Sequence, residues 1–183
     1  MKSTFLAIAV LTTGSLMSAN WTVDSNISRP ADFRTVQAAH NSASVAPGDV
    51  LYLMPCSVSY GALTMTKPLT IIGTGYLLNQ NLPFNVPAPS ARTSTINFGP
   101  GSDGSMITGL EVEGNIAFIK VDEVFPSHIT IKRNYIKGSI STATGANSSN
   151  IQILQNHVTS GCNFGPSQNS GMVIRGNFGG GEP

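Results

Sequence analysis

Three segments near the C-terminal end of the chain share one template and align without gaps in their central part. The template is Ser-x-Φ-x-Ile-x-x-Asn, where Φ is an apolar residue, and its copies begin at Ser127, Ser149 and Ser170, at intervals of 22 and then 21 residues. Residues 105–114 match it one residue out of register, and residues 69–75 are a more distant relative. A unit of about 22 residues cannot bury its own apolar face, so the units must stack on one another.

Each unit is expected to be a short strand that ends in a turn. Apolar residues alternate, as in Ile129 and Ile131, which is typical of a strand with one buried face, and Gly and Asn follow each strand. Leucine-rich repeats have a Leu-x-x-Leu-x-Leu pattern that these units lack. In a parallel β-helix the same position recurs on every coil, about 4.7–4.9 Å above the last. The repeat therefore favours a parallel β-helix.

A structural asparagine ladder follows from this stacking. The template places Asn134, Asn156 and Asn177 at the same position of successive units. Stacked asparagines can bond their side-chain amides along the column, and an Asn in a tight turn can adopt the left-handed backbone conformation. We therefore expect both features at these three residues.

The N-terminal part is expected to cover the open end of the stack. Residues 31–43 have apolar residues at helical spacing, with Asp32 as the expected N-cap, and a strand at 50–53 follows the turn at 47–49. The uncovered edge of a stack invites aggregation, and solenoids have atypical terminal units for this reason. The sequence thus predicts a capping helix ahead of the first coil.

These N-terminal segments also resemble a known family. The stretches 33–39, 47–53, 60–61 and 67–73 resemble the N-terminal capping region of pectin-lyase-like right-handed β-helix proteins, and Ile107 to Val112 resembles their recurrent coil. The likeness covers about residues 31 to 178. It implies an all-β, right-handed parallel β-helix, with coils from about residue 50 to 178 in a single domain of residues 21–183. Because lyases, hydrolases, epimerases and adhesins share this fold, the resemblance implies little about function.

Two features of the sequence differ from that family. Its enzymes are generally longer and have more coils, and this chain ends directly after a coil. We therefore expect a fragment whose last coil edge pairs with missing chain or with another subunit.

The first 20 residues have the pattern of a secretory signal peptide. Lys2 precedes an apolar run from Phe5 to Leu11, and small residues follow at 18–19. Removing residues 1–20 leaves nine basic and nine acidic side chains. A sparsely charged, near-neutral protein is a poor partner for nucleic acid or an anionic membrane, which both require clustered Lys and Arg. We expect a secreted or cell-surface protein with no membrane insertion after cleavage, and polysaccharide as the partner class.

The two cysteines are expected to be free thiols. Several coils separate Cys56 from Cys162, which places them roughly 15–20 Å apart along the axis at ~4.8 Å per coil. A disulfide requires Cα atoms within about 7 Å.

No catalytic residue can be named from the sequence. In polysaccharide lyases of this fold, the resemblance implies Ca²⁺ held by acidic side chains and an Arg or Lys beside the abstracted proton. The outward positions Thr130, Gln152 and Val173 are uncharged, so this ladder supplies neither. Glu111 and Glu113 are expected to point outward from one strand. Such a pair of carboxylates can bind a cation or act as a glycosidase pair, or it can simply be the solvated face of a half-buried strand.

Four charged residues remain as binding candidates. One repeat unit contains Lys132 and Arg133, and the segment just before it contains Asp122 and Glu123. These four side chains can converge on one flank of adjacent coils, or they can form a solvated salt-bridge cluster. We expect no metal or other cofactor, with Ca²⁺ only if the chain is part of a lyase.

Two functional classes therefore remain. The first is a non-catalytic extracellular β-helix module that binds glycans or acts as a surface spacer. The second is the N-terminal portion of a polysaccharide lyase or glycoside hydrolase acting on a pectin-like acidic polysaccharide, with its catalytic coils missing. The uncharged ladder favours the first.

Overall fold

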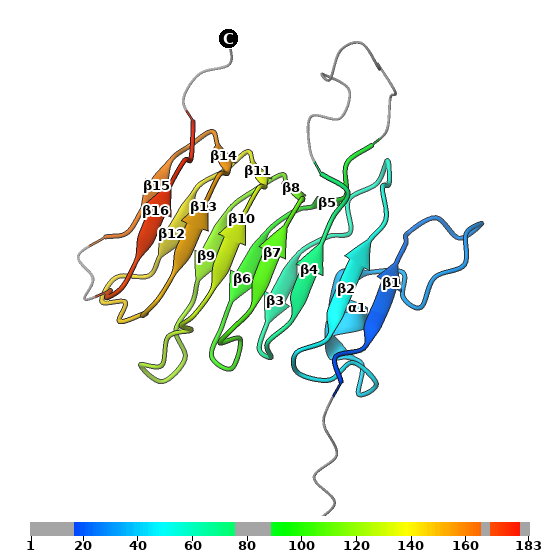
Figure 1. Ribbon diagram of the computed structural model, residues 1–183, viewed down its shortest axis with the longest axis horizontal. Helices are drawn as coiled ribbons and strands as arrows, with labels where there is room; N and C mark the ends of the chain where they lie inside the picture. Colours follow the sequence, from blue (N-terminus) through cyan, green and yellow to red (C-terminus); the bar gives the residue numbers. More distant parts are fainter. Residues whose placement is uncertain (1–16, 76–88, 166–168, 180–183) are drawn as a thin grey trace, which may run out of the picture.

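The computed structural model describes residues 17–75, 89–165 and 169–179. It is an all-β solenoid of about five turns with parallel sheets and very little helix, which confirms the predicted fold class. The turns follow one another along the long axis of the molecule, with β1 and α1 at one end and β15 and β16 at the other (Figure 1). Of the predicted leader, residues 1–16 lie outside the described part.

Three parallel sheets form the walls of the solenoid. The seven-stranded sheet contains, in spatial order, β1 (Asn20–Val23), β2 (Val50–Leu53), β4 (Thr70–Ile72), β7 (Met106–Thr108), β10 (Thr130–Lys132), β13 (Gln152–Leu154) and β16 (Val173–Arg175). The five-stranded sheet contains β3 (Leu63–Met65), β6 (Ile96–Phe98), β9 (Ile116–Phe118), β12 (Ile140–Thr142) and β15 (Cys162–Asn163). The four-stranded sheet contains β5 (Arg92–Thr93), β8 (Glu111–Val112), β11 (Tyr135–Ile136) and β14 (His157–Val158).

The sequence repeat sets the register of the seven-stranded sheet. Ile131 pairs with Ile107 on one side and with Ile153 on the other, and Ile153 pairs with Ile174. These isoleucines point inward, and the first three are fully buried. Since side chains alternate across a strand, the residues on either side of each isoleucine point outward. The residue before each isoleucine forms one outward column of the sheet, and the residue after it forms a second outward column.

The interior is a continuous apolar column that receives side chains from all three sheets. Phe98 and Phe118 stack inside it with ring centroids 5.4 Å apart, and isoleucines and leucines fill the remaining positions. Burial of this apolar surface provides the main driving force for stacking, because no single coil can enclose its own apolar face.

A short helix, α1 (Val36–Asn41), caps the five-stranded sheet. Gln37 accepts a hydrogen bond from the backbone N–H of Thr64 and donates one to its carbonyl oxygen, at 2.8 and 3.3 Å. His40 Nε2 accepts from the N–H of Thr66 at 3.0 Å. These side chains bond the free edge of β3 as a neighbouring strand would, which is the role expected of a capping helix.

The helix is shorter than predicted and has a different N-cap. It begins at Val36 because the Thr35 hydroxyl accepts from the N–H of Ala38. The prediction of Asp32 as N-cap was wrong. Its carboxylate instead accepts from the N–H and the hydroxyl of Thr22, and these bonds lower the pKa of Asp32.

The strand β1 precedes the helix and was not predicted. It adds to the edge of β2, and the buried Asp49 holds its start. The Asp49 carboxylate accepts from the N–H groups of Ala19 and Ala46 and from the indole of Trp21, each at 2.8 Å. Burial alone raises the pKa of Asp49, but these three bonds and the charge of Lys67 outweigh it, so the pKa lies below its usual value. Ala19, on the leader side of the predicted boundary, is thus bonded into the first turn.

The opposite end of the described solenoid is less covered. The inward column that is fully buried at Ile153 is 48% exposed at Ile174, and Phe178 is 55% exposed. Within the described residues, no strand lies beyond β16 in the seven-stranded sheet.

Candidate functional site

A groove rich in cations lies on the outer face of the seven-stranded sheet, over β10, β13 and β16. These are the yellow-green, orange and red strands at one end of the solenoid in Figure 1. Its volume is about 690 Å³. We call it the basic groove, and it is lined by Lys132, Arg133, Gln152, Leu154, Gln155, Val173, Arg175 and Gly176.

The second outward column of the sheet forms the centre of this groove. Lys132 pairs with Leu154, and Leu154 pairs with Arg175, so their side chains project from successive coils on the same face. Within the described residues, neither Lys132 nor Arg175 has an ion-pair partner. The basic groove thus has three cations, two amide side chains and no carboxylate among its lining residues.

The turn that follows each strand forms one rim of the groove. Arg133 and Gln155 have left-handed backbones, with φ of 53° and 54°, and Gly176 has a φ of 62° at the same position of the next coil. The expectation that the ladder asparagines are left-handed was therefore wrong, because the residue before each asparagine has this conformation. Arg133 Nε donates to Gln155 Oε1 at 3.1 Å, which holds the two side chains of the rim together.

The structure separates the four predicted binding residues into two pairs. Lys132 and Arg133 line the basic groove at the C-terminal end of β10. Asp122 and Glu123 lie in the loop before β10, both with positive φ, and Glu123 forms an ion pair of 2.7 Å with Lys120. No ion pair joins the acidic and basic pairs within the described part of the chain.

Sequence reasoning missed Arg175 as a member of this site. It considered only the outward residue before each central isoleucine, and that column (Thr130, Gln152 and Val173) is uncharged. The residue after each isoleucine also points outward, and this position gives Lys132, Leu154 and Arg175. The template Ser-x-Φ-x-Ile-x contained this signal.

The asparagine column is a hydrogen-bonded ladder in which Asn134 and Asn156 are fully buried and Asn177 is half-buried. Asn156 Oδ1 accepts from the N–H of Asn134 at 3.0 Å and from its amide at 3.1 Å. Asn177 Oδ1 accepts the same two kinds of bond from Asn156, at 2.8 and 2.9 Å. At the top of the column, Asn134 Oδ1 accepts from the N–H of Leu110, which occupies the corresponding position in its coil. The ladder satisfies backbone groups at the turn and so has a structural role.

The two outward glutamates of β8 and its following turn both take part in ion pairs. Glu111 lies 2.9 Å from Lys137, and Glu113 lies 3.4 Å from Arg92. The hydrogen bond and charge of Glu111 raise the pKa of Lys137. This arrangement fits the solvated face of a strand.

Aromatic rings stack beside these ion pairs on the outer face of the four-stranded sheet. His157 lies between Tyr135 and Phe178, with ring centroids 4.8 and 4.7 Å away. Stacking of rings at this distance stabilises the contacts between successive coils, so His157 has a packing role.

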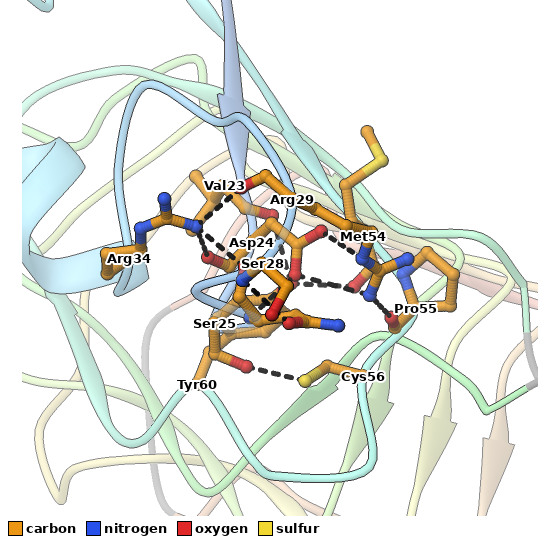
Figure 2. A network of polar contacts seen from close by, with 11 residues as sticks. Val23, Asp24, Ser25, Ser28, Arg29, Arg34, Met54, Pro55, Cys56 and Tyr60 are labelled. Atoms are coloured by element: carbon orange, nitrogen blue, oxygen red, sulfur yellow. Dashed lines mark hydrogen bonds and ion pairs between the residues drawn. The ribbon is translucent and has the colours of Figure 1, made fainter.

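A second polar cluster joins the loop after β1 to the loop after β2 (Figure 2). Asp24 is buried and forms an ion pair of 2.9 Å with Arg29, which also donates to the carbonyl of Pro55. Tyr60 contacts the carbonyl oxygens of Val23 and Met54 in the same cluster, and burial raises its pKa to about 12. The cluster fastens the N-terminal loops to the first coil.

Cys56 belongs to this cluster, with its Sγ 2.6 Å from Ser25 Oγ (Figure 2). Burial alone raises the pKa of the thiol, but hydrogen bonds from Ser25 and the backbone of Val58 outweigh it and lower the pKa. Cys56 and Cys162 are both free, as predicted.

The described residues contain no group of three or more His, Cys, Asp or Glu side chains placed to hold a metal ion. They also contain no helix of sufficient length and apolar character to cross a membrane. No family model matches the chain, and no curated protein or solved structure matches it either.

Proposed function

We propose that the protein is a non-catalytic extracellular module of the pectin-lyase-like β-helix type, which binds glycans at the basic groove. One observation carries this proposal. Lys132 and Arg175 face solvent with the amide of Gln152 on three consecutive coils, in a groove of about 690 Å³.

The groove has the chemistry that a sugar chain requires. Lysine, arginine and glutamine side chains donate hydrogen bonds, and sugar hydroxyls and ring oxygens accept them. Leu154, half-buried between the two cations, offers an apolar floor on which the C–H face of a sugar ring can pack. Binding sites generally combine such an apolar floor with a few polar groups that fix orientation.

The rigidity of the sheet favours binding without rearrangement. Backbone hydrogen bonds between parallel strands hold the lining residues of β10, β13 and β16 in fixed register. A ligand that meets a preformed surface loses less free energy to ordering of the protein.

A steric substitution tests this function independently of charge. Leu154→Trp places a large ring on the floor of the groove, and we expect it to weaken glycan binding at least tenfold in affinity electrophoresis against immobilised polysaccharides. Ile72→Trp is the matched control, because Ile72 points outward in the same column, three strands away. If neither variant changes glycan binding, or if the wild-type protein binds no glycan, the proposal is wrong and a spacer role replaces it.

A second assay tests the non-catalytic part of the proposal. We expect no unsaturated product when the protein is incubated with polygalacturonate and Ca²⁺ and followed by ultraviolet absorbance. Measurable product would show a lyase and overturn this part.

A further inference from the structure

Two apolar columns of the solenoid end in exposed side chains at the same end of the described chain. The inward isoleucine column is fully buried at Ile153, but its last member, Ile174, is about half exposed. The ring stack on the four-stranded sheet continues from His157 to Phe178, and Phe178 is also about half exposed. Within the described residues, no further coil covers these two side chains, so the end of the solenoid is an apolar surface in contact with solvent.

The opposite end of the solenoid is covered by its own chain. At the outer edge of β1, the N–H of Asp24 donates to the carbonyl of Phe33, and the N–H of Phe33 donates to the carbonyl of Thr22, at 3.0 and 3.1 Å. The helix α1 bonds the edge of β3 in the same way. A second copy therefore finds no free edge to extend at this end, and head-to-tail stacking of copies is blocked.

The strand β16 has unused backbone groups on its outer side (Figure 1). The N–H of Val173 donates to Ile151, and the carbonyl of Arg175 accepts from Gln155, at 2.8 and 2.9 Å, so both residues bond toward β13. Successive residues of a strand direct their backbone groups to opposite sides. The N–H and the carbonyl of Ile174 therefore point away from β13, and no described strand meets them. Such an edge is a template for pairing with another strand.

Antiparallel pairing of β16 with the same strand of a second copy satisfies these groups. In an antiparallel ladder, two residues of a hydrogen-bonded pair exchange both of their N–H···O bonds. Placing Ile174 opposite the partner's Ile174 forms this pair on a two-fold axis normal to the sheet. Side chains directly opposite lie on the same face, so the two inward isoleucines meet and the two apolar cores join. Arg175 then lies opposite the partner's Val173, so no like charges are directly opposed.

The end of the solenoid fits a second copy better than another kind of partner. Arg175 is the only charged residue in the stretch 159–179, and it points outward, so this end has little to attract a nucleic acid or another highly charged partner. A single peptide strand added to β16 covers Ile174 but leaves Phe178, beside β14, exposed. A second copy ends in the same three walls and extends over the whole end.

We propose that the protein forms a two-fold symmetric dimer through this end of the solenoid, with β16 antiparallel to the same strand of the partner and Ile174 on the axis. The contact is isologous, because the same surface is used on both copies, and so it closes at two copies. The outer face of the seven-stranded sheet stays open to solvent, so this inference is independent of glycan binding at the basic groove.

Molar mass in solution tests the dimer. Sedimentation velocity and light scattering of the full chain, over a wide range of concentrations, should show a reversible equilibrium between one chain and a species of twice its mass. A single chain at every concentration would overturn the proposal. Assemblies that grow without limit would also overturn it, because a two-fold contact cannot propagate.

Two substitutions at Ile174 test the place of the contact. Ile174→Pro removes an N–H that the chain itself does not use, so circular dichroism should be unchanged while the dimer dissociation constant rises at least about tenfold. Ile174→Lys places like charges against each other on the axis and should also give single chains. Val124→Lys is the matched control, because Val124 is similarly exposed in the loop before β10, and it should leave the dimer intact. If both Ile174 variants fold and dimerise as the wild type does, the contact lies elsewhere and the proposal is wrong.

A cross-link tests the register. Hydrogen-bonded antiparallel pairs have Cα atoms about 5.5 Å apart, within the range of about 4.4–6.8 Å that a disulfide spans. In a Cys162→Ser background, which removes the exposed native thiol, Ile174→Cys should give a covalent dimer with oxidised glutathione, as seen on a non-reducing gel. Val124→Cys in the same background should give little. No covalent dimer from Ile174→Cys, or equal amounts from both variants, would refute pairing about Ile174.

Discussion

Replacing Asn156 with alanine tests the stacking of the coils at its most buried polar point. The side chain of Asn156 makes four hydrogen bonds, and the residue is fully buried. Its oxygen accepts twice from Asn134, and its amide donates to the carbonyl of Ile131 and to Asn177. The substitution removes all four bonds and leaves the N–H of Asn134 without its acceptor.

We expect the free energy of unfolding to fall by about 3–5 kcal/mol. A typical hydrogen bond contributes about 0.5–1.5 kcal/mol net, and a buried donor left without a partner costs about 1–3 kcal/mol. Asn177→Ala should cost only about 1 kcal/mol, because Asn177 lies at the less covered end of the column, where water can replace the lost bonds. Asn147→Ala, at an exposed loop residue, should change stability by less than about 0.5 kcal/mol.

Urea unfolding measures these differences with two probes. Far-ultraviolet circular dichroism follows all coils, and the fluorescence of the single tryptophan, Trp21, follows the N-terminal end. Because solenoids can unfold in parts, agreement of the two probes also reports whether one transition describes the molecule. A loss below about 1 kcal/mol for Asn156→Ala would refute the structural role of the ladder.

Three further predictions concern the rest of the fold. Asp49→Asn should lower the free energy of unfolding by about 1–3 kcal/mol at pH 7, because an amide cannot accept all three bonds of the carboxylate. The pKa of Asp49 is lower in the folded state than its unfolded value near 3.8, so ionised Asp49 stabilises the fold above that value and this stabilisation is lost as pH falls through the folded pKa. In urea melts, the difference in free energy of unfolding between wild type and Asp49→Asn should therefore narrow below about pH 4. A wider difference at low pH would contradict the direction of the pKa shift. In native protein, iodoacetamide should label the exposed Cys162 well before the buried Cys56. Both thiols should react once the chain is unfolded, and mass spectrometry counts the labels. If unfolded protein that has not been reduced takes fewer than two labels, the cysteines form a disulfide and the prediction is wrong. Gly73→Ala should cost about 1–3 kcal/mol in the same melts, because a Cβ atom there overlaps backbone of the next coil, while Gly165→Ala meets nothing within 4 Å and should be nearly neutral.

The repeat template predicted the fold because one physical requirement sets both sequence and structure. Inward isoleucines must recur once per coil, and their spacing gave the register of β10, β13 and β16 directly. Hydrogen bonding along the stack likewise favours asparagine at one position of the last three coils. The isoleucine and asparagine signals each lie within a few residues of one repeat unit and recur in the following units, so the sequence alone reveals them.

Features that depend on local backbone geometry were harder to predict. The left-handed residue of each turn is Arg133 or Gln155, one position before the asparagine, and neither residue type favours that conformation. The helix begins at Val36, since Thr35 accepts the capping bond and Asp32 is bound to β1. The strand β1 begins at Asn20, the last residue of the predicted leader, so its first residue was assigned to the signal peptide.

The candidate site was only half predictable. Lys132 and Arg133 were identified from their charge, and Asp122 and Glu123 were grouped with them by sequence proximity. The short strand β10 separates the two pairs, and the partner of Lys132 in the groove comes from β16, two coils away in space and more than forty residues away in sequence. Finding Arg175 requires applying the template to both outward positions of each strand.

Backbone amide chemical shifts during a titration with galacturonate oligomers test the central claim most directly. The isotope-labelled protein of 19.1 kDa is suited to this measurement. We predict that the largest shifts map to the groove residues of β10, β13 and β16 and to the turn after each strand, and that they disappear in the Lys132→Gln, Arg175→Gln double variant. Shifts that cluster on the outer face of the five-stranded sheet, around Asn97 and Ser141, would contradict the assignment of the basic groove as the binding site.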